Sequence, residues 1–184
     1  MLLPIEIKNI RIAELDTLTP EEVEQYANVL KYLNPVPNVG KYKARDLYEM
    51  EFAEVTNIRM AVKDERFFDA MSIYYKIPMI FLLKKKLIEY SHALNHMVKE
   101  LNILIEREIT VLSREPDQDW VASGVKELDK FGALNVLDQL GQQFGKAPTE
   151  VETWTYGLVF GLLWKRSVEA DINERYREIT KNKK

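Results

Sequence analysis

The stretch from Pro78 to Pro116 constrains the fold most, because no Gly or Pro interrupts it. It predicts one long helix over about residues 79–113. Along it, mostly apolar side chains recur at alternating spacings of four and three, as in the seam of a coiled coil. The seam comprises Leu83, Leu87, Tyr90, Leu94, Met97, Leu101, Leu104, Glu108 and Val111. Such a helix would be about 50 Å long, so other segments must cover it.

The two halves of this helix differ in character. From Val98 to Leu112 a second apolar stripe widens the apolar arc, which predicts the central strut of a core. Toward Pro78 the arc is narrow and lies beside lysines, and we expect an interface there. Its predicted members are Leu83, Leu87, Tyr90 and Leu94.

Composition narrows the possible functions. The 184 residues have a formal net charge of −3, which gives no overall footprint for nucleic acid. The chain has no cysteine, which removes disulfides and thiolate chemistry. No apolar run approaches the roughly 20 residues that span a bilayer, so we expect a soluble chain without membrane contact.

Residues 1–18 are predicted to form an extended arm or short strand. Apolar Leu3, Ile5 and Ile7 alternate with polar neighbours. An isolated strand is unstable, so the arm must pair within this chain or with a neighbouring copy. We therefore count Ile5 and Ile7 among the predicted interface residues.

Residues 19–184 are predicted to form one mainly α-helical domain, a multi-helix bundle organised on the long helix. Thr19 with Glu22 predicts a capping box that opens a helix. Prolines and a glycine predict an irregular loop over 34–40. Further helices are predicted over 45–62 and 65–77, the second carrying an aromatic cluster that suits core packing better than a binding platform.

A C-terminal helical subdomain is predicted over 119–180. It breaks near Phe131-Gly132, and Thr149 with Glu152 predicts a second capping box that opens a last helix running to about Thr180. The charged half of that helix is expected to leave the domain. Tyr176 and Ile179 recur on it and complete the predicted interface.

The only two histidines, His92 and His96, share a helix face with Glu89 and Glu100. These four side chains could bind a divalent metal, but Ala93 stands where a zinc protease needs Glu. We favour a solvated polar face and predict no cofactor. Nor does the sequence offer a phosphate-binding glycine loop or a nucleophilic triad, so we predict no enzyme.

Two charged features remain. The run Lys84 to Lys86 could contact phosphates locally, although such runs are more often solvated. Glu108 interrupts the apolar seam, so we expect it to meet a cation from another helix or to mark the edge of the packed region.

Two C-terminal stretches carry a resemblance: residues 123–137, SGVKELDKFGALNVL, and residues 149–160, TEVETWTYGLVF. A short helix ending at Phe-Gly, a Leu-rich helix and a capped Trp/Tyr helix resemble small helical proteins of tailed phages. These are head–tail ring or adaptor proteins and tail-assembly chaperones. The resemblance implies a non-enzymatic ring or connector subunit of the virion, assembled in the host cytoplasm as a homo-oligomer with other virion proteins.

Two alternatives stay open. A tail-assembly chaperone would bind a tail protein transiently and be absent from the particle. A helical regulator would bind nucleic acid through the lysine run, with an affinity that falls as salt rises.

Overall fold

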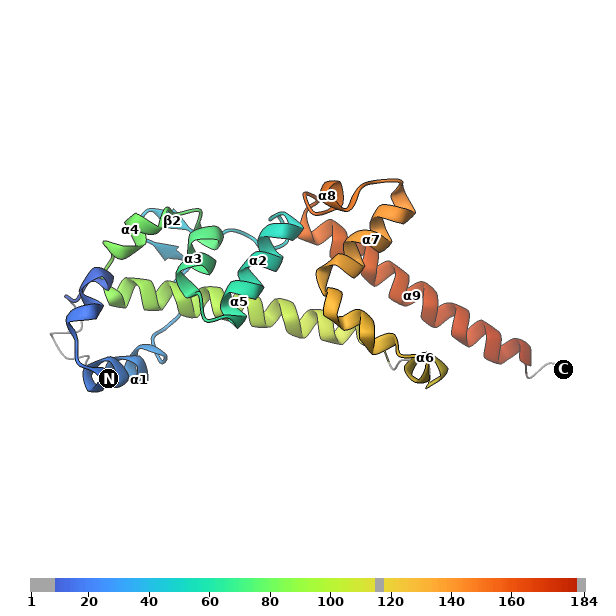
Figure 1. Ribbon diagram of the computed structural model, residues 1–184, viewed down its shortest axis with the longest axis horizontal. Helices are drawn as coiled ribbons and strands as arrows, with labels where there is room; N and C mark the ends of the chain where they lie inside the picture. Colours follow the sequence, from blue (N-terminus) through green and yellow to red (C-terminus); the bar gives the residue numbers. More distant parts are fainter. Residues whose placement is uncertain (1–8, 115–117, 182–184) are drawn as a thin grey trace. The chain divides into compact units, whose positions relative to one another are not determined.

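The computed structural model describes residues 9–114 and 118–181, and it is mainly α-helical, as predicted (Figure 1). The chain divides into two compact units. Unit 1 comprises Met1–Leu47 and Glu54–Ile103, and unit 2 comprises Tyr48–Ala53 and Leu104–Lys184. Whether they fold independently is a separate question, so the single domain over residues 19–184 stays a prediction.

Unit 1 opens with a 3₁₀ helix, η1 (Ile12–Thr17), followed by α1 (Pro20–Leu30). The predicted capping box of α1 is confirmed. The Glu22 amide donates to Thr19 Oγ1 over 3.3 Å, and the Thr19 amide donates to the Glu22 carboxylate over 2.8 Å. The predicted arm residues Leu3, Ile5 and Ile7 lie outside the described residues.

The loop predicted over residues 34–40 runs into a small hairpin that the sequence did not predict. Strands β1 (Asn38–Val39) and β2 (Tyr42–Lys43) are antiparallel, and Val39 pairs with Tyr42. Gly40 turns the chain at φ +58°, a conformation that favours glycine. Val39 is fully buried, so the hairpin belongs to the core of unit 1.

Helices α2 (Phe52–Lys63) and α3 (Phe67–Tyr75) follow. The helix predicted from residue 45 begins only at Phe52. Arg45 instead pairs with Glu54 at 2.6 Å and donates to the Ile73 carbonyl, which holds the preceding segment in a non-helical path. Tyr74 and Tyr75 of the predicted aromatic cluster are buried, which supports the prediction of core packing, and a third tyrosine of unit 1, Tyr90, is also buried.

The predicted long helix is broken in two: α4 (Met79–Leu83) and α5 (Leu87–Leu112). The chain near Arg11 explains the break. The Ile12 amide donates to the Lys85 carbonyl and the Leu87 amide donates to the Ile10 carbonyl, at 3.0 and 2.8 Å. These bonds flank an antiparallel bridge between Arg11 and Lys86 that separates the two helices, so the start predicted at residue 79 is wrong for the long helix and right for α4.

Unit 2 contains the short α6 (Gln118–Ala122), the 3₁₀ helix η2 (Val125–Phe131) and α7 (Ala133–Phe144). They are followed by the short α8 (Pro148–Val151) and the long α9 (Tyr156–Lys181). Gly132 breaks the chain where Phe131-Gly132 was predicted to do so, with φ +50°. Figure 1 shows the C-terminal turns of α9 extending beyond α7 and α8.

The last predicted helix also proves to be two helices. Thr149 is not its cap, because α8 begins at Pro148 and the Glu150 carboxylate accepts from the Ala147 amide. Residues 152–155 instead pair with the Tyr48–Ala53 segment. There the Tyr156 and Gly157 amides, which open α9, donate to the carbonyls of Met50 and Tyr48 at 2.7 and 2.9 Å.

Candidate interaction surfaces

The predicted interface on α5 is largely covered by unit 1 itself. Leu87 and Tyr90 are each 6% exposed, and the ring of Tyr90 lies 5.2 Å from that of Phe68. Leu83 and Leu94 are half-buried. Side chains so thoroughly covered offer almost no surface to another subunit, and an interface through Leu87 and Tyr90 stays a prediction.

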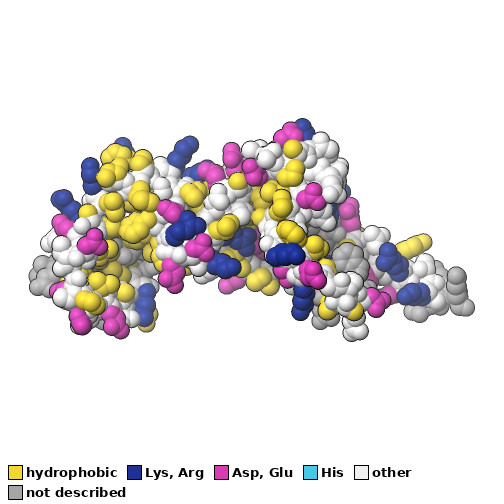
Figure 2. Space-filling view, viewed as in Figure 1, with side chains coloured by type: hydrophobic (Ala, Val, Ile, Leu, Met, Phe, Trp, Pro, Cys, Tyr) yellow, Lys and Arg dark blue, Asp and Glu magenta, His cyan; other side chains and the backbone are white. Residues whose placement is uncertain are grey.

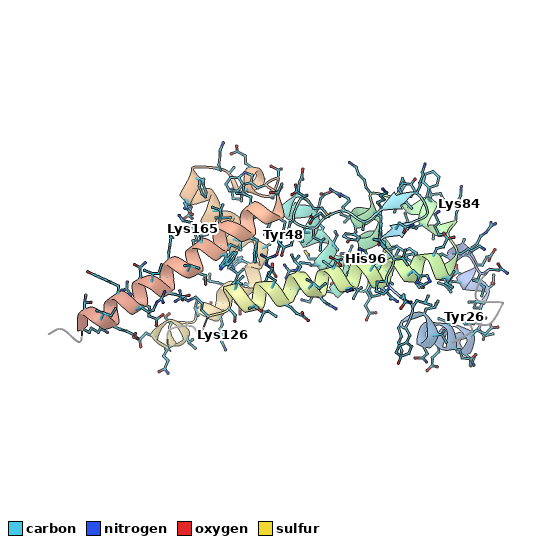
Figure 3. All side chains as sticks on the ribbon, turned by 180° about the vertical axis from the view of Figure 1, so that it is seen from behind. Tyr26, Tyr48, Lys84, His96, Lys126 and Lys165 are labelled. Carbon is cyan, nitrogen blue, oxygen red and sulfur yellow. The ribbon has the colours of Figure 1, made fainter. Side chains whose placement is uncertain are left out.

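The four metal candidates do not converge. His92 donates from Nδ1 to the Asn34 carbonyl over 2.6 Å, which occupies one of its ring nitrogens. His96, which Figure 3 labels on α5, has its ring centroid 6.4 Å from that of Tyr74. Within residues 9–114 and 118–181, no three His, Asp or Glu side chains gather as metal ligands would, Glu89 and Glu100 included.

The polar face of α5 instead hydrogen-bonds to the end of α1 and the residues just after it. The Asn95 amide donates to the carbonyls of Leu30 and Leu33 over 3.1 and 2.9 Å, and the Val36 amide donates to the His92 carbonyl. The last carbonyls of a helix have no partner inside it, so Asn95 acts as a remote cap. Sequence reasoning missed this role, although Asn95 lies one turn from His92 on the polar face.

The lysine run lies at the break between α4 and α5. Lys84 Nζ lies 5.7 Å from the centre of the Phe81 ring, and Lys85 Nζ lies 4.0 Å from a Glu89 oxygen. The side chain of Lys85 also packs on Gly40, where an added Cβ would clash with Nζ. The run is thus partly engaged within unit 1, and phosphate contact stays a prediction.

An exposed apolar cluster adjoins these lysines on α4. Met79, Ile80 and Phe81 are 42%, 58% and 45% exposed. Figure 2 shows apolar side chains gathered over α4 with basic side chains at their edge. This cluster is a second candidate contact surface, and the sequence analysis did not single it out.

Glu108 is a half-buried carboxylate in unit 2. The Tyr156 hydroxyl, on α9, donates to its carboxylate, and Tyr156 is 2% exposed. Beside it, the guanidinium of Arg107 lies 5.5 and 5.6 Å from the ring centres of Tyr48 and Phe160. Glu108 therefore hydrogen-bonds to a hydroxyl of another helix, and the cation expected as its partner stays a prediction.

The C-terminal half of α9 exposes a regular apolar stripe. Val168, Ile172, Tyr176 and Ile179 are 43%, 51%, 66% and 57% exposed. On a helix with 3.6 residues per turn they fall within an arc of about 80°. We call these four residues the α9 stripe. It contains Tyr176 and Ile179 of the predicted interface, whose partner stays a prediction.

Charges are sorted along the same turns of α9. Residues 169–174 carry Glu169, Asp171 and Glu174 and no basic side chain, whereas residues 175–181 carry three basic side chains and one acidic. Arg114 pairs with Asp171 at 2.7 Å and with Glu174 at 3.1 Å. The stripe therefore runs from an acidic segment into a basic one.

Comparisons with protein-family models, curated proteins and solved structures found no match. None of the described helices is long and apolar enough to cross a bilayer. The fold and its surfaces thus define a class only: a mainly α-helical protein with exposed apolar helix faces.

Proposed function

We propose that this chain is a non-enzymatic assembly protein that acts through protein–protein contacts. The α9 stripe carries the proposal, because four large apolar side chains stay exposed along one face of a helix. Contiguous exposed apolar surface of this kind is typical of sites that bind other proteins. The exposed cluster on α4 adds a second surface of the same kind in unit 1.

The resemblance of residues 123–137 and 149–160 to tailed-phage proteins makes the proposal more specific. The chain would be a ring or connector subunit at the head–tail junction of a virion. Subunits of a ring contact copies of themselves, and connectors also contact other virion proteins. A tail-assembly chaperone is the alternative, because the same resemblance covers it.

Mass spectrometry of purified particles tests the proposal. A ring or connector subunit is retained in the particle at a fixed ratio to other virion proteins. A chaperone is found in the infected-cell lysate and is absent from the particle. Absence from both would overturn the assembly role.

A matched pair of variants links the test to the surface. Ile172→Asp places a charge in the α9 stripe, whereas Asn173→Asp places the same charge on an exposed position away from it. Retention in particles should fall for Ile172→Asp and stay normal for Asn173→Asp. Equal retention of both variants would contradict a role for the stripe.

A further inference from the structure

The charges beside the α9 stripe indicate what covers it. In a parallel pair about a two-fold axis, opposite edges of the stripe meet, so Asp171 of one copy would lie near Glu169 of the other, carboxylate beside carboxylate. In an antiparallel pair the same edges meet, so Asp171 lies near Arg175 of the other copy, the basic side chain of residues 175–181 that adjoins the stripe. Opposite charges across an interface favour encounter and set its orientation, whereas like charges disfavour it.

We infer that the α9 stripe binds the α9 stripe of a second copy of this chain, in antiparallel orientation about a two-fold axis. With the axis between Asn173 and Glu174, Val168 of one copy lies opposite Ile179 of the other. Ile172 and Tyr176 then pack near the centre. The contact is self-complementary, as a two-fold interface requires.

A specific ion pair follows from this register. Asp171 and Arg175 both lie along one edge of the stripe, and in a two-fold antiparallel pair the same edges meet. Asp171 of each copy then lies within about one residue, or about 1.5 Å, of facing Arg175 of the other. Arg114 contacts Asp171 through Oδ1, so Oδ2 can accept from that second arginine.

Light scattering on the full chain gives the first test. The wild-type chain should have the mass of a dimer or a multiple of it, and Ile172→Asp should weaken association at least about tenfold. Arg175→Asp should weaken it as well, because a carboxylate then replaces the guanidinium that faces Asp171 of the other copy. Arg177→Asp is the matched control, since Arg177 lies roughly 140° around the helix from the stripe.

Exchanging the two charges tests the pairing itself. The double variant Asp171→Arg with Arg175→Asp should associate more tightly than either single variant, because the pair is restored with its signs reversed. A wild-type chain that stays monomeric at all concentrations would overturn the inference. So would an unchanged mass in Ile172→Asp, or a double variant no better than the singles.

Cross-linking tests the orientation, and the absence of native cysteine makes every introduced thiol unique. Val168→Cys combined with Ile179→Cys should form disulfides between two chains under mild oxidation. Val168→Cys alone should not, because the two thiols would lie about 16 Å apart along the helices. Cross-linking by the single variant would indicate a parallel pair and overturn the proposal.

The inference rests on the proposed function only in treating the stripe as a protein-binding surface. The two fail in different experiments. A chain retained in particles, yet unaffected in mass by Ile172→Asp, would leave the assembly role intact and overturn the self-pairing. A dimer whose mass responds to every variant, in a chain absent from particles and lysate, would support the self-pairing and overturn the assembly role.

Discussion

Replacing Gly141 by alanine should destabilise unit 2, although alanine is the better helix former. Gly141 is buried in α7, and a Cβ built on it would lie 2.6 Å from the Lys146 carbonyl oxygen. That oxygen belongs to the backbone just beyond Gly145, where φ of +64° turns the chain back along α7. The turn must therefore move before alanine can fit.

The net effect is the difference between two opposing contributions. Alanine in place of glycine inside a helix contributes about 1 kcal/mol of stability. Forcing an extra carbon into a packed site costs about 1–3 kcal/mol, and the upper half of that range applies when backbone must shift. We expect Gly141→Ala to lower the free energy of unfolding by about 1–2 kcal/mol.

Gly161 in α9 provides the matched control. It is exposed, and a Cβ built on it meets no atom within 4 Å. Gly161→Ala should therefore show only the helix-forming contribution and raise stability by about 0.5–1 kcal/mol. The same chemical change is thus expected to have opposite signs in two helices of one unit.

Urea unfolding followed by circular dichroism measures both variants. For a chain of this size, each kcal/mol corresponds to about 2–4 °C in the melting temperature, so thermal melts give an independent check. A Gly141→Ala variant at least as stable as wild type would refute the reasoning, because it would mean that the turn at Lys146 yields without cost.

Three further predictions concern other contacts. Thr19→Ala should lower stability by about 1 kcal/mol through loss of the α1 cap, and hydrogen exchange of the first α1 amides should rise. Tyr156→Phe should cost about 1–3 kcal/mol in urea unfolding, since the half-buried Glu108 carboxylate loses a donor. Burial raises the pKa of each of the three buried tyrosines of unit 1 above the ordinary 10.0. Their contribution to stability is therefore full below pH 10.0 and is lost as pH rises through the raised pKa values. In an alkaline titration of tyrosinate absorbance, they should ionise only as the protein unfolds.

Local signals in the sequence predicted local structure well. The capping box at Thr19 and the break at Gly132 depend on residues within a few positions of each other. The residues that determine the geometry of each feature therefore lie within that feature itself. The mainly helical character follows for the same reason, because apolar periodicity is a local property of each segment.

The errors arise where the backbone finds partners far along the chain. Nothing in the sequence near Lys85 and Leu87 indicates that they will hydrogen-bond to Ile12 and Ile10 across more than 70 positions. The segment from Tyr48 likewise diverts the start of α9 by offering carbonyls to its first amides. The periodicity of apolar residues predicts which face of a helix is buried, and it carries no information on such long-range hydrogen bonds.

The same limit applies to the interface residues predicted on α5. A seam requires an apolar partner but does not specify which chain supplies it, and for Leu87 the partner lies in unit 1. The exposure of a side chain in the folded chain distinguishes packing within the chain from contact with another chain, and it favours an interface on α9.

Leu87→Ala should therefore lower the free energy of unfolding by about 2–5 kcal/mol and leave the mass by light scattering unchanged. Ile172→Ala, at a side chain 51% exposed, should have little effect on the unfolding of the isolated chain and should reduce association. If Leu87→Ala instead dissociated a stable chain, the seam of α5 would be the interface after all.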